Sequence, residues 1–553
     1  MSMQSKPLQS DIHTVVKVRF WDQEITYITM FITCIIIIAA LPTIFAYMTT
    51  PDDRFFTGVV YNIPDHNQYF AWLRDFQHQH LAANRLTAEP NEPALFHLLW
   101  WVSGKFSALF NLSFSVMFNI LRIIGGITLL ITGYLFFRFT ITHPVQRKLA
   151  FILFATGGGL GMIWVVIKYI QQLEEAPFPF DIYTSEPNSF FLALAFPHFA
   201  IALSLIIGVI GFTLLAYQRQ QLRYAVAAGI CGFLIGLQHA YDILTIATVL
   251  GTFGILIWWR DRRFPTFLFQ CGIIIAMFTV PPGAYLSWLV LNDVTWGGKL
   301  AQFDNAGAWT PNLLHLPILL GVPFLLALAS FRPRMLRSQD NAELLFTAWF
   351  LVHFVLAYLP VSFQIHLLLG WQVPIAALAA RFIHTNLWPW ARQRFGKMGV
   401  ITTTTAILTL AMITNIYLVA WRIIDLGRYQ QPYFLSSDEV AALEWLANHT
   451  TKDDVVLGVL EINQHVPPWT DAHAFLAHWA GSLDYYAKID MVAKVLDPNT
   501  PSAERNTILS MYNVRYIIVR EQDVNREQFN AATNSELTLV FNQGSVAIYQ
   551  RKR

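Results

Sequence analysis

The chain is dominated by apolar segments that are long enough to cross a lipid bilayer. A helix needs about 20 such residues to span the hydrocarbon core, and roughly eleven segments of this kind follow one another. They are residues 27–47, 116–139, 149–169, 190–217, 224–238, 243–259, 264–291, 313–331, 342–359, 367–383 and 400–424. Hydrophobic residues make up 55% of the 553 and charged residues 13%, with a mean hydropathy of +0.43, which excludes a water-soluble globule. The sequence therefore predicts a polytopic α-helical membrane protein. The two short segments around 238–242 could also form one re-entrant hairpin, so the number of crossings is good to about two.

The basic residues between these segments predict the orientation. Lys and Arg gather in alternate connections, at 138–148, 219–223, 260–263, 332–337 and 392–397. Such residues are retained on the cytoplasmic side. We therefore expect residues 1–26 to be a cytoplasmic segment, residues 27–431 to form the membrane domain, and the rest of the chain to lie outside. The formal net charge of +2 is too small to indicate a nucleic-acid partner.

Residues 432–553 differ in character from the membrane domain. The stretch 436–450 has the pattern of an amphipathic helix with an acidic first turn, and three later stretches are rich in β-branched residues. We expect a small extracytoplasmic α/β domain, with a turn at 542–545 between two strands. The three cysteines, Cys34, Cys231 and Cys271, lie inside apolar segments and indicate packing instead of a disulfide framework or a metal cluster.

Two connections on the outer side are acidic, the loops at 49–93 and 171–188. The simplest interpretation is that they are solvated and lack Lys and Arg, which stay inside. Asp65 differs because it lies in PDHNQYFAWLRDF, residues 64–76, directly beside the predicted bundle. A carboxylate held against a membrane surface needs a partner or a function, so we predict that Asp65 is catalytic.

Several ionisable residues fall within the apolar segments at one depth, near the outer edge. They are His198, His239, Asp242, His353 and His366. A single histidine in such a segment can equally be a packing residue. Several at the level of an acidic outer loop favour a shared polar cavity, and Pro197 would free a helical carbonyl toward it.

These features together resemble the C-type (GT-C) glycosyltransferases. Asp65 and Tyr69 fall where protein O-mannosyltransferases and the aminoarabinose transferases of lipid A carry an acidic pair followed by an aromatic residue, and His66 replaces the second acid. The stretches 186–199, 237–245 and 358–374 look like bacterial members of this group, although Ile365 and His366 stand where basic residues are expected in the relatives.

The resemblance implies a membrane glycosyltransferase that transfers a hexosyl or pentosyl group. The expected donor is a polyprenyl-phosphate-linked sugar, and the expected acceptor is a lipid, a glycan or a protein. The enzyme would act at the outer face of a bacterial cytoplasmic (inner) membrane, in contact with membrane lipids. Asp65 would be the general base. The residues expected to bind the substrate or the lipid phosphate are His66, Tyr69, Arg74, Glu186, His198, His239, Asp242 and His366. A divalent cation on Asp65, Asp181 and Glu186 is an open alternative.

Two other functions remain compatible with the sequence. One is a transporter or flippase of a lipid-linked saccharide, with the histidines as a proton relay and the glycines at 157–161 as a hinge. The other is a non-catalytic GT-C-like scaffold that displays the outer domain. The stretch 465–486 can act as a lid over the cavity or be a structural loop.

Overall fold

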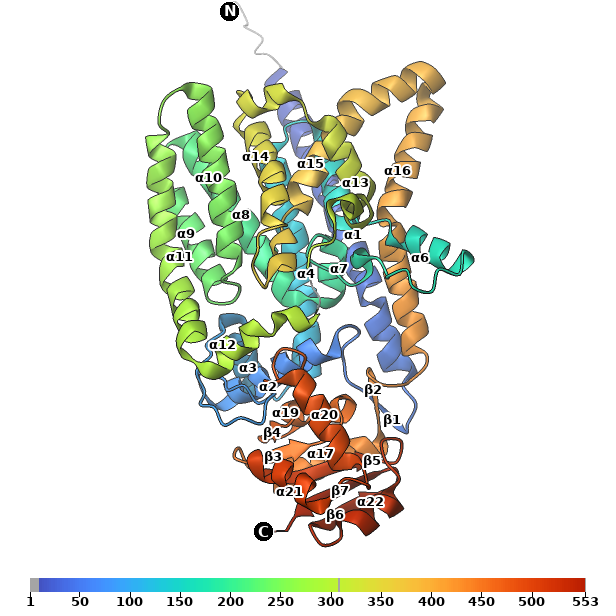
Figure 1. Ribbon diagram of the computed structural model, residues 1–553. Coiled ribbons are helices and arrows are strands. Elements are labelled where there is room, and N and C mark those ends of the chain that lie inside the picture. The colour runs from blue at the N-terminus through green and yellow to red at the C-terminus, as the bar shows by residue number, and fades with distance from the viewer. Residues whose placement is uncertain (1–8, 307–308, 553) are drawn as a thin grey trace, which may run out of the picture.

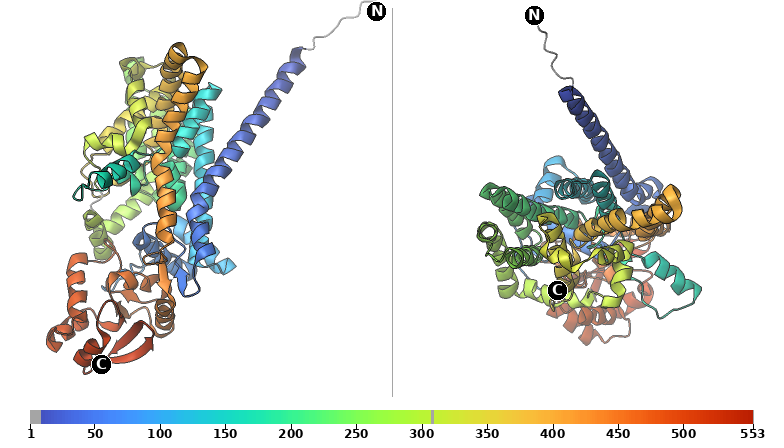
Figure 2. Two further views of the ribbon diagram at one scale, coloured as in Figure 1. Left: turned by 90° about the vertical axis from the view of Figure 1, so that its right-hand side faces the viewer. Right: turned by 90° about the horizontal axis from the view of Figure 1, so that it is seen from above.

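The computed structural model describes residues 9–306 and 309–552, and the side chains from Gln23 onward, apart from those of residues 304 and 306. The first eight residues of the expected cytoplasmic segment lie outside this range, and its remainder belongs to helix α1 (Gln9–Thr49). The molecule has two parts, an upright bundle of helices and a small sheet domain below it (Figure 1). Helix α1 leans away from the bundle at its N-terminal end (Figure 2).

Each apolar segment of the sequence is helical in the structure. The bundle comprises α1, α4 (Phe114–Thr140), α5 (Pro144–Thr156), α6 (Gly161–Ile170), α7 (Ser189–Ala195), α8 (Pro197–Arg219), α9 (Leu222–Gly236), α10 (Asp242–Asp261), α11 (Thr266–Asn292), α13 (Leu316–Ser330), α14 (Asn341–Leu356), α15 (Gln372–Phe382) and α16 (Trp388–Leu426). Short 3-10 or π turns join them, namely η1 (Phe180–Ile182), η3 (Leu313–His315), η4 (Pro333–Arg337), η5 (Gln364–Leu368) and η6 (Ile383–Leu387).

By length and composition, seven helical stretches of the described residues can cross a membrane, or eight if the bent pair α5 and α6 is one span. One of them, residues 364–426, contains both α15 and α16 and leaves helical geometry at Gly396, whose φ is 63°. Helices α9 and α14 are apolar but shorter. The protein is a polytopic α-helical membrane protein, as predicted.

Close helix packing in the bundle depends on small residues. Gly229, Gly232 and Gly236 of α9 form a notch that receives α11, since a Cβ on any of them would come within 2.6 Å of a side chain of that helix. Small residues let helix backbones approach closely where the surrounding lipid is as apolar as the side chains. Helix α11 is thereby fixed to α9 and not to α10, which packs mainly against α14.

The basic connections meet at the end of the bundle far from the sheet domain (Figure 1). Arg147, in the first turn of α5, hydrogen-bonds to Glu24 in the first half of α1. Arg260, at the end of α10, donates to the carbonyl of Ser338 before α14. Lys- and Arg-rich connections and the sheet domain therefore occupy opposite ends of the bundle.

The opposite end carries short elements that connect the bundle to the sheet domain. These are β1 (Arg54–Phe56), α2 (Ile63–His78), α3 (Leu98–Phe110), α12 (Val294–Ala301) and η2 (Phe303–Ala306). Strand β1 pairs antiparallel with β2 (Phe434–Ser436), where the sheet domain begins. The first connecting loop and the sheet domain are therefore joined by main-chain hydrogen bonds.

The sheet domain is an α/β unit with five strands in the order β4-β3-β5-β7-β6. Strands β4 (His473–Ala474), β3 (Val455–Leu457) and β5 (Val514–Arg520) are parallel, and β7 (Val546–Arg551) and β6 (Leu537–Gln543) form an antiparallel hairpin at one edge. The turn of this hairpin lies at residues 544–545, within the predicted turn. The helices are α17 (Ser437–His449), α18 (Leu460–Asn463), α19 (Val466–Trp469), α20 (Tyr485–Leu496), α21 (Ser502–Met511) and α22 (Arg526–Thr533). Ser436 and Glu439 form a capping box that starts α17.

Candidate functional site

Helix α2 carries Asp65 into the layer between the bundle and the sheet domain. The helix begins after Asn62, and Pro64 and Asp65 occupy its first turn, where proline costs no hydrogen bond and a carboxylate is favoured by the helix dipole. Tyr69 follows one turn later on the same face. The sequence of this turn therefore fixes an acid and an aromatic residue side by side.

Asp65 is held by two side chains. Its Oδ1 accepts a 2.7 Å hydrogen bond from Nε2 of His478, in the sheet domain, and its Oδ2 accepts one of 2.5 Å from the Asn62 amide. The Asp65 side chain is 22% exposed, whereas that of His478 is 3% exposed. Burial alone would raise the pKa of Asp65, but the His478 hydrogen bond and the nearby positive charges keep it below its usual value. Asp65 is therefore an ionised carboxylate with a face still open.

The tautomer of His478 follows from its main-chain neighbours. The backbone N–H groups of Ala480 and Gly481 both donate to Nδ1 of His478, at 3.0 and 2.9 Å. Because these groups can only donate, Nδ1 carries no proton, and the single proton of the neutral ring is on Nε2, facing Asp65. Burial lowers the pKa of His478 and favours this neutral form.

Lys299 of α12 supplies a positive charge beside the same helix. Its ammonium group donates to the side chain of Gln68, one turn after Asp65, and lies 4.8 Å from the ring centre of Trp72 and 5.2 Å from that of Trp296. Burial lowers the pKa of Lys299 to about 7, although the charge of Asp65 acts in the other direction. Lys299 is thus a poorly solvated cation that would gain from an anionic ligand.

On the bundle side, Tyr69 leads into a chain of ring contacts. The Tyr69 hydroxyl lies 3.2 Å from Nε2 of His198, at the start of α8, and the rings of His198 and His239 have their centres 5.5 Å apart. His239 binds Asp242 at 3.0 Å through Nδ1 and meets the Tyr241 hydroxyl at 3.2 Å through Nε2. These residues come from α2, α8 and the turn before α10.

The chain of contacts continues through His366 and returns to Asp65. His366 stacks on Tyr241 with ring centres 5.2 Å apart, and its Nδ1 lies 2.6 Å from Glu186. Phe303 lies between His366 and Trp479, at 6.3 and 5.6 Å from their ring centres. Trp479 is the neighbour of His478. The closed circuit, here named the site rim, consists of Asp65, Tyr69, His198, His239, Tyr241, His366, Phe303, Trp479 and His478.

The sheet domain is clamped onto the rim by Gln302. Its side-chain amide donates to the carbonyls of Ala480 and Ser482, at 3.1 and 2.9 Å, and its oxygen accepts from the backbone N–H of Tyr485 at 3.1 Å. The stretch 465–486, for which the sequence left a lid and a structural loop open, thus packs against α2 and contributes two residues to the rim.

His66 and Arg74 were predicted to bind the substrate. The structure places His66 next to Tyr69 of the rim, with ring centres 5.8 Å apart, and Arg74 at the contact between α2 and the sheet domain. The ring nitrogens of His66 face the carbonyls of Asn62 and Ala195 at 2.7 and 3.2 Å, and the residue is fully buried. Arg74 pairs with Asp471 of the sheet domain at 2.8 Å. Both side chains hold elements together in this structure, and their role in binding a substrate stays a prediction.

The helix break at Pro197 also differs from its expected role. Helix α7 ends at Ala195, and the carbonyls near its end are taken by buried side chains instead of pointing into a cavity. Arg122 of α4 donates to the carbonyls of Ala193 and Leu194 at 3.5 and 3.3 Å, and His66 lies against that of Ala195. The carbonyls at the break therefore all have side-chain partners and do not line a cavity.

The three acids considered for a cation do not form one site. Asp181 is buried and accepts hydrogen bonds from the backbone of Gly161 and the hydroxyl of Thr414. It fills the space beside Gly159 and Gly161, where a Cβ would come within 2.2 Å of its carboxylate. Glu186 is bound to His366 and Asp65 to His478. Over the described ranges, no three His, Cys, Asp or Glu residues are arranged to hold a metal ion.

His353 does not join the other histidines. It is fully buried in α14, its Nδ1 lies 2.9 Å from the Trp349 carbonyl, and its ring stacks on Trp371. Of the predicted site residues, the structure brings together Asp65, Tyr69, His198, His239 and His366. Asp242 contacts His239, and Glu186 contacts His366.

Sequence reasoning missed the roles of His478 and Lys299. The sequence carried a signal for each. Lys299 is the single Lys or Arg between Arg263 and Arg332. Trp479 follows His478, and the small residues Ala480 and Gly481 come next and form the turn that binds its ring.

The fold is that of several solved membrane glycosyltransferases. The archaeal oligosaccharyltransferase AglB from Archaeoglobus fulgidus, solved with an inhibitory peptide and a dolichol-phosphate, aligns at a TM-score of 0.53 and 14% identity, over 95% of this chain and 74% of that one. ArnT from Cupriavidus metallidurans, bound to undecaprenyl phosphate, aligns at 0.53 and 11%, over 95% and 98%. The arabinofuranosyltransferase AftD from Mycobacteria aligns at 0.51 and 13%, over 94% and 40%.

No protein-family model and no curated protein matches the sequence. The likeness thus lies in the fold, which is the GT-C fold that the sequence predicted.

Proposed function

We propose that the protein is a membrane glycosyltransferase that takes its sugar from a polyprenyl-phosphate-linked donor. The neighbours in fold support this class, since AglB and ArnT were solved with dolichol-phosphate and undecaprenyl phosphate. The observation that carries the proposal is the Asp65–His478 pair, an ionised carboxylate kept partly exposed in a rim of aromatic and imidazole rings. Perturbed, partnered acids of this kind cluster at catalytic sites.

Asp65 acts as the general base in this proposal. The acceptor oxygen attacks the anomeric carbon and passes its proton to Asp65, while the bond from that carbon to the phosphate oxygen breaks and its electrons leave with the polyprenyl phosphate. Each carboxylate oxygen has two lone pairs, so Asp65 can receive the proton while it keeps the His478 and Asn62 hydrogen bonds. His478 holds the carboxylate in one orientation throughout.

The phosphate gains negative charge as it leaves, and Lys299 is placed to balance it. Its ammonium group lies beside α2, where it interacts electrostatically with the charge of Asp65. The aromatic surroundings have low polarity, so a charge interaction there is strong. His198, His239 and His366 on the bundle side offer further ring nitrogens to the donor. The acids of the site do not converge, so no step is assigned to a metal ion.

In this proposal the reaction takes place at the outer face of a bacterial cytoplasmic membrane. The basic connections lie at the opposite end of the bundle from the sheet domain, and such connections face the cytoplasm. The rim, between the bundle and the sheet domain, is then outside. The acceptor in this proposal is a lipid, a glycan or a protein.

The test uses the purified protein in lipid nanodiscs with a panel of radiolabelled polyprenyl-phosphate hexoses and pentoses. We expect transfer, or slow hydrolysis, from at least one donor, and a loss of roughly 100-fold or more in Asp65→Asn, the scale on which removal of a general base acts. Asp53→Asn, an exposed acid of the same loop, is the matched control. Full activity in Asp65→Asn, or neither turnover nor binding with any donor, would refute the proposal.

A further inference from the structure

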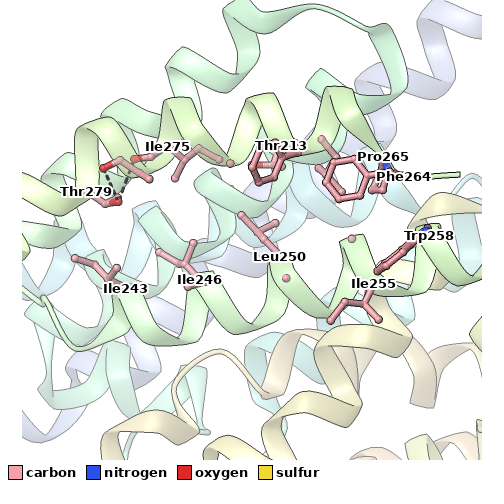
Figure 3. Close-up of a pocket in the computed structure, with 17 residues that line it drawn as sticks. Thr213, Ile243, Ile246, Leu250, Ile255, Trp258, Phe264, Pro265, Ile275 and Thr279 are labelled. Carbon is pink, nitrogen blue, oxygen red and sulfur yellow. Dashed lines mark hydrogen bonds between the residues drawn. The ribbon is translucent and has the colours of Figure 1, made fainter.

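A polar pocket lies between the loop that connects α2 to α3 and the sheet domain. It is here named the loop pocket, encloses about 500 Å³, and is lined by residues between positions 79 and 93 of that loop and by residues 452, 453, 455, 473 and 511–513 of the sheet domain. Its lining differs from that of the groove between α10 and α11, where apolar side chains face one another (Figure 3). Carboxylate, guanidinium, amide and imidazole groups surround the loop pocket. Such groups select a polar ligand through hydrogen bonds.

His473 brings an uncommitted ring nitrogen to the loop pocket. The residue is 8% exposed, and its Nδ1 donates a 2.9 Å hydrogen bond to the carbonyl of Thr87. Burial lowers the pKa of His473, so the ring is neutral and Nε2 carries a lone pair. Nothing among the described residues hydrogen-bonds to this Nε2. Since an acceptor in so buried a residue costs stability without a partner, the nitrogen calls for a donor group in the pocket.

Arg85 supplies a donor on the same pocket. The residue is 9% exposed, its Nε donates to Asp75 at 2.8 Å, and one of its Nη groups donates to the carbonyl of Asp471. The other Nη group has no hydrogen-bond partner in the described part of the chain. Because two bonds hold the planar guanidinium in place, its remaining N–H groups keep a fixed direction. The loop pocket therefore combines an oriented donor with an oriented acceptor.

The charges around the loop pocket nearly cancel. Two of its charged residues are bound in the ion pairs Glu89–Lys488 and Arg85–Asp75. The exposed charges on its wall are the acids Glu92 and Asp453 and the base Lys452. The two acids would repel an anionic ligand, and a cationic ligand would lie beside Lys452 and the guanidinium of Arg85. The pocket therefore favours a neutral ligand.

A saccharide fits this set of groups. Each sugar hydroxyl can donate and accept, so a sugar can bind carboxylates, the Arg85 guanidinium and Nε2 of His473 at once. Tyr512 and Met511 add apolar surface on the same wall, against which the C–H groups of a sugar ring can pack. The volume lies within the range of about 300–1,000 Å³ that is usual for ligand pockets. Size and chemistry thus agree on a neutral polyhydroxyl ligand.

Hydrogen bonds connect the loop pocket to the segment that carries His478. Thr87, whose carbonyl binds His473, follows Leu86 in the loop. The Leu86 carbonyl accepts a 2.6 Å hydrogen bond from the hydroxyl of Ser482, and that hydroxyl accepts one of 3.1 Å from the backbone N–H of His478. The loop therefore has the pocket on one side and the partner of the catalytic acid on the other.

The loop pocket is remote from the acid itself. Gln79, at the end of α2, lines the pocket, whereas Asp65 lies in the first turn of that helix. The helix between them measures roughly 21 Å at about 1.5 Å per residue. A single sugar could not reach both places, so a ligand common to them would be a chain of several sugars.

We propose that the loop pocket binds a neutral oligosaccharide, the part of a glycan acceptor that lies far from the reacting end. The inference rests on the proposed function for the role of this glycan as acceptor, and it narrows the acceptor from a lipid, a glycan or a protein to a glycan. The bound chain holds loop residues 84–89 against the segment of His478. It thereby stabilises the pairing of His478 with Asp65.

Two exposed carboxylates test the pocket without disturbing its buried groups. Glu92→Gln combined with Asp453→Asn removes both charges at nearly constant shape. The matched control is Glu444→Gln combined with Asp490→Asn, two exposed acids of α17 and α20 that do not line the pocket. Asp65→Asn keeps the pocket and removes the proposed base.

Binding is measured by calorimetry on the full-length protein in nanodiscs, without a donor, so that the result does not depend on turnover. The probes are neutral oligosaccharides of glucose, mannose, galactose, arabinose or N-acetylglucosamine, each beside its monosaccharide. At least one oligosaccharide should bind more tightly than its monosaccharide, and the pocket variant should weaken it by roughly tenfold or more, the scale of a hydrogen bond to a charged group. The control variant and Asp65→Asn should bind it as the wild type does. No binding by any oligosaccharide, or equal binding by the pocket variant, would overturn the assignment.

Hydrogen exchange locates the ligand and separates a glycan from a peptide. The bound oligosaccharide should slow exchange in residues 84–92, 452–455 and 511–513 and, through the contact of Leu86 with Ser482, in residues 477–483. An unstructured peptide rich in Ser and Asn is the comparison probe. The same protection by this peptide, with the same loss of binding in the pocket variant, would overturn the glycan assignment in favour of a protein acceptor.

The two proposals fail in different ways. Glycan binding at the loop pocket without transfer from any donor would refute the proposed function and leave the pocket assignment in place. Sugar transfer by a protein that binds no oligosaccharide would refute the pocket assignment alone.

Discussion

The ring of His478 donates a 2.7 Å hydrogen bond to the carboxylate of Asp65, a residue 413 positions earlier in the chain. One residue belongs to the sheet domain and the other to the loop that leaves the first membrane helix. The pairing of β1 with β2 brings these two regions together. Asp65, the acid predicted from the sequence, thus has its histidine partner only when the sheet domain is docked on the bundle.

Removal of the His478 side chain should change the pH dependence of transfer. Because its hydrogen bond favours the ionised form of Asp65, His478→Ala raises the pKa of Asp65, and the acidic limb of the kcat/KM profile moves to higher pH. At neutral pH we expect a loss of roughly tenfold, the value of one hydrogen bond to a charged group. The measurement is kcat/KM for transfer across the pH range. His449→Ala, at an exposed position of α17, should leave the profile in place, and an unmoved acidic limb in His478→Ala would contradict the prediction.

Binding of polyprenyl phosphate should weaken as the pH rises through the pKa of Lys299. That pKa is about 7 in the unoccupied site, so the cation is present below this value and lost above it. Lys299→Arg stays charged at all accessible pH values and should flatten the dependence. Dissociation constants at about pH 6 and pH 9 give the comparison, with Lys452→Arg as an exposed control. The same affinity at both pH values in the wild type would rule out a role for Lys299 in anion binding.

The contribution of Lys299 to protein stability should increase with pH, whereas its contribution to the binding of polyprenyl phosphate decreases. Lys299 has a lower pKa in the folded than in the unfolded chain, so the unfolded chain binds more protons between about pH 7 and 10.5. The contribution of Lys299 to the free energy of unfolding therefore increases with pH in this window. Thermal unfolding of Lys299→Met at about pH 7 and pH 9 should show a smaller increase than the wild type.

His366 and His353 should separate catalysis from packing. His366→Ala removes a rim residue whose side chain is 21% exposed, and we expect transfer to fall by roughly tenfold or more with little change in melting temperature. His353→Ala leaves a cavity beside Trp371 and should cost roughly 2–4 kcal/mol of stability while each folded molecule keeps its activity. Activity per folded molecule, from transfer rates and thermal melting, distinguishes the two. The reverse pattern would place His353 in the site.

Gln302→Ala should loosen the docked segment that carries His478. Three hydrogen bonds between Gln302 and residues 480–485 are lost, each worth about 1 kcal/mol. Hydrogen exchange of residues 478–485 should increase, and kcat should fall while the rest of the sheet domain keeps its protection. Gln528→Ala, at an exposed position of α22, is the control. Unchanged exchange at 478–485 would mean that other contacts hold the segment.

The membrane fold could be predicted because the apolar composition of each helix is visible within its own segment of the sequence. All of the apolar segments are helical, but the described residues hold seven or eight stretches that can cross a membrane instead of roughly eleven. Helices α9 and α14 are shorter than a crossing, and segments 367–383 and 400–424 belong to one helical stretch. The β-branched stretches and the turn at 542–545 predicted β3, β5, β6 and β7 in the same way, whereas the two-residue strand β4 was not predicted. Asp65 stood out because a charged residue beside an apolar bundle is rare.

The partners of Asp65 could not be predicted because nothing local in the sequence relates position 65 to positions 299 and 478. The histidines show the same limit. His198, His239 and His366 meet, but His353 faces Trp371, and α14 is apolar on all sides, so its sequence does not indicate which face is turned inward. Depth in the membrane can be counted along a helix, whereas rotation about its axis is set by packing.

The two backbone N–H groups that occupy Nδ1 of His478 limit what this histidine can do. A ring with one nitrogen committed in this way cannot accept a proton on one side and release it on the other. The proton that Asp65 takes from the acceptor therefore cannot pass on through His478. It would stay on Asp65 until the glycosylated product departs. Under the proposed function, each turnover would then release its proton from the exposed face of Asp65 and not through the sheet domain.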